Sequence, residues 1–285
     1  MIYHYTSVET LHNILKKYRE SKEKQYLELW ASSIYMLNDP MEMLMAQNVI
    51  IRVLESLEVE MSIDKTYRLS KSFLDAKAIR ERYLKTLNLD NYIFVISFSN
   101  NKDTLPMWSM YSKDGKGVCL CLNEEILSKY FEDNDDLQTK IVSVSYDLTN
   151  LNETTRKELC RLYQLYIKEM EDEEIPDKEN LKHFYQYHFI RVLAPIYKDS
   201  TYNYEGEKRL ICTQQQNVES IDFRVSANGF IIPYRRINIP VNALKEIIIG
   251  PSYNYELFSK GLKMELILSG VQANIIKSKV YYRTL

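Results

Sequence analysis

The sequence predicts one α+β domain with largely helical insertions at about 41–88 and 152–196. Segments with the alternation of strands follow one another with segments of helical periodicity, and no internal repeat, low-complexity stretch or linker divides the chain. The chain has 285 residues, which is long enough to bury a substantial core. These observations favour a single domain over residues 1–285.

A short strand at the N-terminus is predicted to lead into a helix near residue 7. Thr6 and Glu9 have the T-x-x-E spacing of a capping box. Apolar residues then recur at helical spacing, at Leu11, Ile14, Leu15 and Tyr18. Further helices are predicted at 41–58, at about 64–87, around the apolar stripes 159–170 and 181–193, and near 252–269.

The segment 92–99 is predicted to be a buried, central strand. It is rich in β-branched and aromatic residues and is too short for a helix. Other strands are predicted at 27–31, 139–146, 207–215, 228–234, 245–249 and 273–283.

Pro106 is expected near the first position of a short helix that carries Trp108 and Tyr111. The next strand contains Cys119 and Cys121, whose spacing of two places both thiols on one face. No second pair of Cys or His lies at zinc spacing, so we expect these thiols to pack rather than to bind metal.

Composition and charge exclude several classes of protein. Lys and Arg number 37 and Asp and Glu 39, so the net charge of −2 provides no global positive field for nucleic acid or an anionic membrane. The start of the chain lacks the apolar stretch of a secretion signal. None of the four cysteines forms a C-x-x-C pair, as is typical of reduced thiols. We expect a cytoplasmic protein that binds neither membranes nor nucleic acid in general.

Common catalytic fingerprints are missing from the sequence. It contains no G-x-G-x-x-G, G-x-x-x-x-G-K-[ST], H-E-x-x-H or G-x-S-x-G pattern. His183 and His188 are five residues apart, which places them off a common helix face. We therefore predict no metal site.

Three places on predicted strands hold polar side chains that are suited to chemistry. They are His4, the pair Ser97 and Ser99, and the pair Glu205 and Glu207. Residues two apart on a strand face the same way, so each pair is expected to project from one face. Two carboxylates at such close range raise the pKa of one of them if they are buried.

Each of these places has a structural alternative. Glu207 on a surface strand is expected to pair with Lys208 or Arg209 neighbours across the sheet. His4 alone is more often a structural histidine. Trp108 is most simply a core residue, although a Trp at a proline-initiated turn also suits an aromatic wall for a flat ligand.

The motifs at these residues resemble those of a bacterial and phage family catalogued as domain of unknown function 2971. The resemblance rests on Tyr3-His4-Tyr5-Thr6-Ser7, Leu37-Asn38-Asp39-Pro40-Met41-Glu42, Ser97-Phe98-Ser99, Met107-Trp108-Ser109-Met110-Tyr111, Gly117-Val118-Cys119-Leu120 and Tyr202-x-x-Glu205-x-Glu207-x-Arg209. The closing residues 248–251 and 275–283 also resemble the end of that family. Tyr202 departs from the family pattern, which usually has Trp there.

The order of these motifs also resembles the three-part signature of ADP-ribosyltransferases. An early strand His precedes a capped helix, a middle strand carries Ser-x-Ser, and a late strand carries Glu-x-Glu. The resemblance implies a split, twisted, mixed or antiparallel sheet whose cleft binds NAD as the substrate. It implies an NAD-dependent ADP-ribosyltransferase or NAD glycohydrolase that acts as an anti-phage defence or toxin effector.

The same resemblance implies roles for the candidate residues. Glu207 stabilises the positive charge that develops on the ribose C1 carbon, and Glu205 orients or deprotonates an acceptor. Substitution of Glu207 by Gln is then expected to abolish NAD cleavage and to leave the fold intact. The cofactor-binding residues are His4 on the adenosine ribose, Ser97 and Ser99 in the middle of the cleft, Trp108 or Tyr111 on nicotinamide, and Arg209.

A second functional class stays open, namely a non-catalytic nucleotide-sensing or protein-binding module of a defence system. A Glu207 that is neutralised by Arg209 or Lys198 favours this class, because such a carboxylate does not stabilise an oxocarbenium ion. The partners are then a nucleotide ligand and a protein of the defence system, or a macromolecular acceptor if the protein is catalytic. A metal-dependent phosphodiesterase or nuclease is a third reading, and it requires clustered acidic residues.

Overall fold

The computed structural model describes residues 1–37, 42–73, 93–134, 139–147, 153–213, 221–226 and 229–282. The chain forms two compact units. The first consists of Met1–Ser33, Phe94–Ser143 and Asn203–Leu285, and the second of Ile34–Ile93 and Val144–Tyr202. The segments predicted as helical insertions, 41–88 and 152–196, both fall in the second unit.

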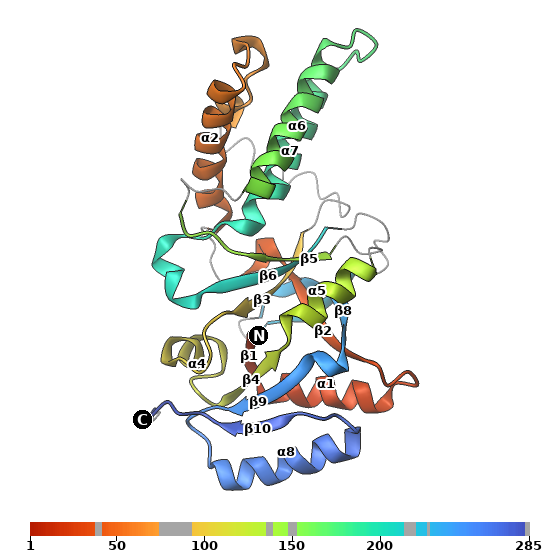
Figure 1. Cartoon of the computed structure of the whole chain (residues 1–285), viewed down its shortest axis with the longest axis vertical. Coiled ribbons are helices and arrows are strands. Elements are labelled where there is room, and N and C mark those ends of the chain that lie inside the picture. Colours follow the sequence, from red (N-terminus) through yellow and green to blue (C-terminus); the bar gives the residue numbers. More distant parts are fainter. Residues whose placement is uncertain are drawn as a thin grey trace. The chain divides into compact units, whose positions relative to one another are not determined.

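The first unit is built on one mixed sheet of ten strands (Figure 1). The order is β10-β9-β4-β1-β3-β2-β8-β7, with β6 paired to β3 and β5 paired to β6. The β9–β10 pair is parallel and the others are antiparallel. The strands are β1 (Ile2–Ser7), β2 (Tyr26–Ser33), β3 (Phe94–Ser99), β4 (Gly117–Leu122), β5 (Thr139–Ser143), β6 (Glu207–Cys212), β7 (Ile221–Val225), β8 (Ile231–Pro240), β9 (Leu244–Ile249) and β10 (Asn274–Lys277).

The sheet divides at β3, the strand that the sequence predicts to be central. β6 pairs with β3 from Phe94 to Ser99 and so occupies one edge of it completely. On the other edge, β2 pairs only with Phe94 and Val95, and β1 pairs only with Ser99. Two arms, one led by β1 and one by β2, therefore leave the same edge of β3.

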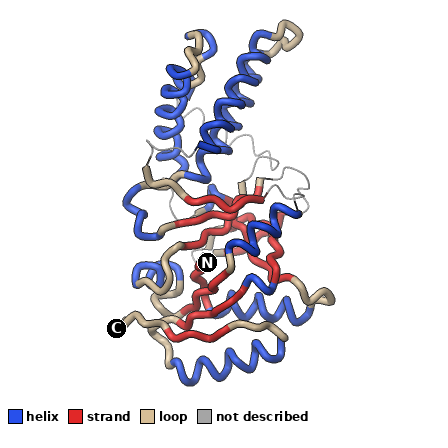
Figure 2. The backbone as a smooth tube through the Cα atoms, in the orientation of Figure 1, coloured by secondary structure: helices blue, strands red, loops and turns tan. Residues whose placement is uncertain are grey.

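Four α-helices accompany this sheet in the described part of the first unit (Figure 2). They are α1 (Val8–Glu20), α4 (Leu105–Tyr111), α5 (Glu124–Asp133) and α8 (Tyr255–Ser269). The apolar stripe predicted for α1 is buried. The periodicity of the sequence did not predict α5, nor β7 at the edge of the sheet.

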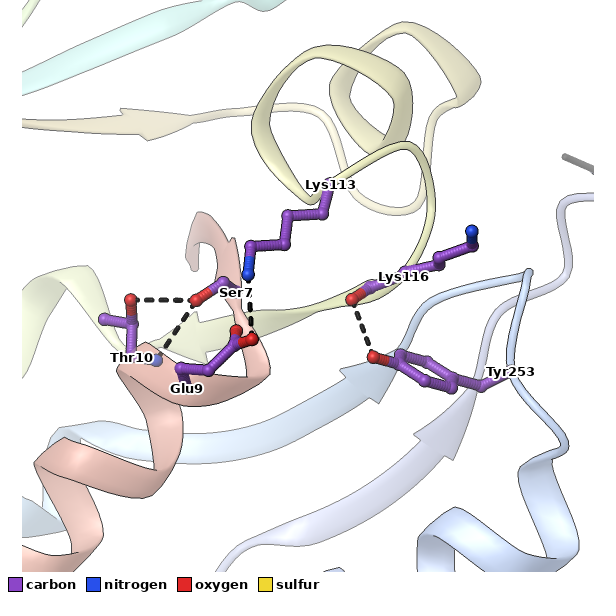
Figure 3. Close-up of polar contacts among 6 residues, drawn as sticks. All are labelled: Ser7, Glu9, Thr10, Lys113, Lys116 and Tyr253. Atoms are coloured by element: carbon purple, nitrogen blue, oxygen red, sulfur yellow. Dashed lines mark hydrogen bonds and ion pairs between the residues drawn. The ribbon is translucent and has the colours of Figure 1, made fainter. Parts of the chain in front are cut away.

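The start of α1 corrects the predicted capping box by one residue (Figure 3). The N-cap is Ser7, whose hydroxyl accepts a hydrogen bond from the Thr10 N–H at 3.1 Å. Thr6 still belongs to β1, because the ladder with β4 extends to Ser7. The Glu9 carboxylate pairs instead with Lys113 at 2.8 Å, so it joins the helix to the loop between α4 and β4.

The second unit is a helical unit with α2 (Glu42–Glu60), α6 (Glu153–Glu171) and α7 (Lys178–Leu193). Helix α7 packs against both α2 and α6. A buried carboxylate, Glu58, accepts hydrogen bonds of 2.6 Å from Tyr163 Oη and Ser70 Oγ. The helix predicted at about 64–87 is wrong in its first part, because Lys65–Tyr67 and Ser70–Phe73 form 3₁₀ turns; its remainder lies outside the described residues.

Candidate functional site

Glu207 and Arg209 form a buried ion pair on β6. Arg209 Nε donates to Glu207 Oε1 at 2.9 Å and Arg209 Nη2 donates to Oε2 at 3.1 Å. The two residues are 4% and 0% exposed. Because they are two apart on one strand, they share a face, and the guanidinium neutralises the carboxylate there. Arg209 is thus the partner of Glu207, as in the predicted alternative, but the pair runs along one strand in the interior rather than across the sheet at the surface.

Glu205 does not share the strand with Glu207, which corrects the prediction for this pair. It ends the 3₁₀ segment Ser200–Glu205, and β6 begins only at Glu207. Gly206 lies between them with φ +51°, a left-handed conformation that glycine adopts readily. The Glu205 side chain is nevertheless buried, at 3% exposure.

The phenol of Tyr111 brings the two carboxylates into one environment. Tyr111 Oη donates a hydrogen bond of 2.6 Å to Glu205 Oε1. Burial raises the pKa of Tyr111, and the hydrogen bond to Glu205 and the charges of Glu205 and Glu207 raise it further. The structure therefore keeps Glu205, Glu207 and Tyr111 together at the end of α4, and we call them, with Arg209, the carboxylate cluster.

Ser97 and Ser99 share a face of β3, as predicted, but differ in access to solvent. Their cross-strand partners on β6 are Arg209 and Glu207, so all four side chains lie on the same face of the sheet. Ser99 is 1% exposed, and its hydroxyl donates to the Glu205 carbonyl oxygen at 2.5 Å. Ser97 is exposed even though it lies within a central strand. Solvent thus reaches the middle of β3 beside the carboxylate cluster.

His4 lies on the other face of the sheet. Tyr3 is paired with Ser99, and Ser99 with Glu207, so the next residue of β1 points away from Glu207. His4 Nδ1 donates to the Ser97 carbonyl at 3.0 Å, and its ring meets Phe98 edge-on at 5.8 Å between centroids. Burial lowers the pKa of His4. The expectation that His4 and Glu207 face one pocket is therefore wrong.

Trp108 is a core residue, in agreement with the structural alternative. Its exposed fraction is 0%, and its ring packs edge-on against Tyr5 with centroids 5.0 Å apart. Its Nε1 donates to Asp103 Oδ1 at 2.7 Å. The indole thus offers no open face to a flat ligand, which argues against the stacking role.

Asp103 is a structural residue that the sequence did not single out. Besides Trp108, its carboxylate accepts hydrogen bonds of 2.6 Å from Ser278 Oγ and from the Lys279 N–H. The Asp103 carboxylate therefore connects the segment after β10 with helix α4 through hydrogen bonds. Its position in the polar turn 100–104 suggested only a loop, since the partners come from the other end of the chain.

One hollow of the described residues lies away from the carboxylate cluster. A hollow of 740 Å³ is lined by β9, β10 and the C-terminal end of α8, and by none of the candidate residues.

In the described ranges, no three His, Cys, Asp or Glu side chains gather as metal ligands. Among the same residues, no helix combines the length and apolarity needed to span a bilayer. Of the motif at 37–42, positions 38–41 lie outside the described residues.

Comparison with known proteins gives one match. Residues 107–210 match the family model described as "Protein of unknown function (DUF2971)". The matched stretch begins in α4 and ends in β6, so it contains Tyr111 and the whole carboxylate cluster but not His4, Ser97 or Ser99. No curated protein and no solved structure matches the chain.

Proposed function

We propose that this chain is a non-catalytic binding module that recognises a nucleotide on the face of β3 around Ser97. The buried Glu207–Arg209 ion pair supports the proposal most strongly, because a carboxylate engaged through both oxygens has little negative charge left for an oxocarbenium ion. The pair is also closed to solvent, at 4% and 0% exposure, so a substrate does not reach the carboxylate directly.

The exposure of Ser97 supports this place of binding. Its neighbours Val95, Ile96 and Phe98 are all buried, so the exposed hydroxyl marks an opening in the middle of the sheet. The division of the sheet at β3 provides the room, since β1 and β2 diverge from the edge that borders Ser97. In this proposal the ion pair holds the floor of the binding face rigid.

The proposal is tested by measuring binding and turnover in the same samples. The purified protein is titrated with NAD, ADP-ribose and ATP in a calorimeter, and free nicotinamide is measured after incubation with NAD. We expect binding of at least one nucleotide without release of nicotinamide. Substitution of Ser97 by Trp should block binding, whereas Ser109→Trp, on the exposed side of α4, should not.

The NAD-cleaving function implied by the ADP-ribosyltransferase resemblance is the second candidate. It is favoured by the hydrogen bond from Tyr111 to the Glu205 carboxylate and by the charge of Glu207, which also raises the pKa of Tyr111. Cleavage breaks the bond between the ribose C1 carbon and the nicotinamide nitrogen, and water or an acceptor takes the ribosyl group. Stabilisation of the ribosyl cation by Glu207 requires Arg209 to break its ion pair with this carboxylate. Nicotinamide release that disappears in Glu207→Gln, at temperatures where the variant is folded, would replace the binding module by this enzyme.

A further inference from the structure

The strand β7 forms an edge of the ten-stranded sheet. Among the described residues it pairs with β8 alone, and β8 and β2 separate it from β3. An edge strand presents backbone N–H and C=O groups that are available to another strand. What such an edge binds depends on which groups and which side chains point outward.

The hydrogen bonds of the hairpin show which backbone groups face away from β8. The Ser226 N–H donates to the Phe230 carbonyl at 2.8 Å, which makes this residue pair hydrogen-bonded. In an antiparallel ladder such pairs alternate, so Asp222 and Arg224 bond to β8, and Ile221, Phe223 and Val225 do not. The partner of Phe223 is Pro233, which has no N–H to donate and fits this assignment. The N–H and C=O groups of Ile221, Phe223 and Val225 therefore point to the open edge.

Apolar side chains surround this edge. Phe223 is 62% exposed, Val225 72% and Ile231 64%, and the register puts all three on one face of the hairpin. Phe230, in the turn, is 67% exposed. Exposed apolar residues that adjoin one another, in contrast to scattered ones, are typical of an interaction surface.

The charges of β7 indicate what kind of strand fits there. Asp222 and Arg224 flank Phe223 symmetrically with opposite sign. Arg224 Nη2 donates to the Ser32 hydroxyl at 3.2 Å, and no described carboxylate pairs with this guanidinium. Burial lowers the pKa of Arg224, as is expected for a partly desolvated cation. Asp222 pairs with Arg236 Nε of β8 at 2.7 Å, where both side chains stay partly exposed, so a second cation can still approach its carboxylate. A partner strand with an acidic side chain opposite Arg224 and a basic one beside Asp222 is favoured.

We propose that this partner is a second copy of the chain, whose β7 pairs antiparallel with the first around a two-fold axis at Phe223. Phe223 then faces its own copy, Ile221 faces Val225, and Asp222 faces Arg224 in both directions. Each pair of outward residues exchanges two backbone hydrogen bonds, and the apolar side chains of both copies form one layer. The interface is self-complementary, as a two-fold axis requires. It does not depend on the proposed nucleotide binding.

The test uses charge reversal in two separate variants. Arg224→Glu places a second carboxylate opposite Asp222 of the other copy, and Asp222→Lys places a second cation opposite Arg224, so each variant alone repels itself. A mixture of the two restores opposite charges at both positions, and a heterodimer should form. We expect wild type to be dimeric in sedimentation. Each variant alone should raise the dimer Kd at least about tenfold, and the mixture should form a heterodimer with a Kd close to that of wild type.

Two further variants keep the test decisive. Val225→Pro removes an outward N–H without removing a bond to β8, so it should dissociate the dimer and retain the fold, as judged by circular dichroism. Met264→Glu changes a similarly exposed apolar residue (65%) on α8 and should leave the dimer intact. A monomeric wild type at high micromolar concentration would overturn the proposal. So would a dimer that withstands Val225→Pro, or one that only Met264→Glu dissociates.

Discussion

Arg209 and Glu207 lie two residues apart on β6 and neutralise each other inside the first unit, with N–O distances of 2.9 and 3.1 Å. A buried pair of this kind contributes little net stability relative to well-packed apolar residues. Loss of one partner is costly, because it leaves the other charge buried and uncompensated. The substitutions at these positions therefore report on structure as well as on function.

Glu207→Gln is expected to lower the free energy of unfolding by about 3 kcal/mol, because Arg209 stays buried without its counter-charge. This revises the expectation that the substitution leaves the fold unaffected. Urea denaturation measures the change. Glu124→Gln is the matched control, since Glu124 pairs at 2.5 Å with Lys208, the neighbouring residue of β6, at a partly exposed site. The control should lose no more than about 1 kcal/mol, and equal losses would mean that Glu207 and Arg209 are not a closed pair.

Tyr111→Phe should lower the free energy of unfolding by about 2 kcal/mol, since it removes the hydroxyl that donates to the buried Glu205 carboxylate. Tyr204→Phe removes a hydroxyl whose partner is the Met110 sulfur, at a residue that is 38% exposed, and should change stability by less than about 0.5 kcal/mol. Thermal melting of both variants provides the comparison. If they behave alike, the Tyr111–Glu205 contact is not stabilising.

Glycine-to-alanine substitutions at two positions should have opposite signs. Gly206 has φ +51°, and an added Cβ would lie 3.0 Å from Asn101 Nδ2, so Gly206→Ala should cost about 1 kcal/mol or more. Gly261 lies within α8, where an added Cβ meets nothing within 4 Å. Gly261→Ala should therefore stabilise the protein by up to about 1 kcal/mol. Denaturation midpoints measure both changes, and a Gly206→Ala variant as stable as wild type, or more stable, would contradict the conformation of the Glu205-Gly206-Glu207 segment.

His4 should make stability depend on pH in the acidic range. Burial lowers its pKa below 6.5 in the folded protein, so the unfolded chain takes up a proton first as the pH falls. Its contribution is complete above pH 6.5 and is lost as the pH falls towards the lower folded pKa. His4→Asn keeps a donor for the Ser97 carbonyl without a titrating group. The stability lost between about pH 7 and pH 5 should be smaller in this variant, and an unchanged loss would exclude His4 as the cause.

Local patterns determined much of the fold of the first unit. The apolar stripe of α1, the central position of β3 and the common face of Cys119 and Cys121 all follow from periodicity, which depends only on neighbouring residues. The same alternation correctly predicted that Ser97 and Ser99 share a face. By contrast, β7 was not predicted, although Ile221, Phe223 and Val225 alternate with polar residues as in a half-buried strand; the structure leaves Phe223 and Val225 exposed at the edge of the sheet.

The composition of the carboxylate cluster was decided by tertiary structure. Glu205 leaves the strand because the chain makes a left-handed turn at Gly206. His4 faces away from Glu207 because of the register of β1 against β3 and of β3 against β6. A shift of one residue in either ladder would reverse the face, and no local pattern specifies it. The sequence by itself offered Arg209 as a partner of Glu207. Only the packing around β6, which removes water from both residues, decided that this pair is buried rather than exposed.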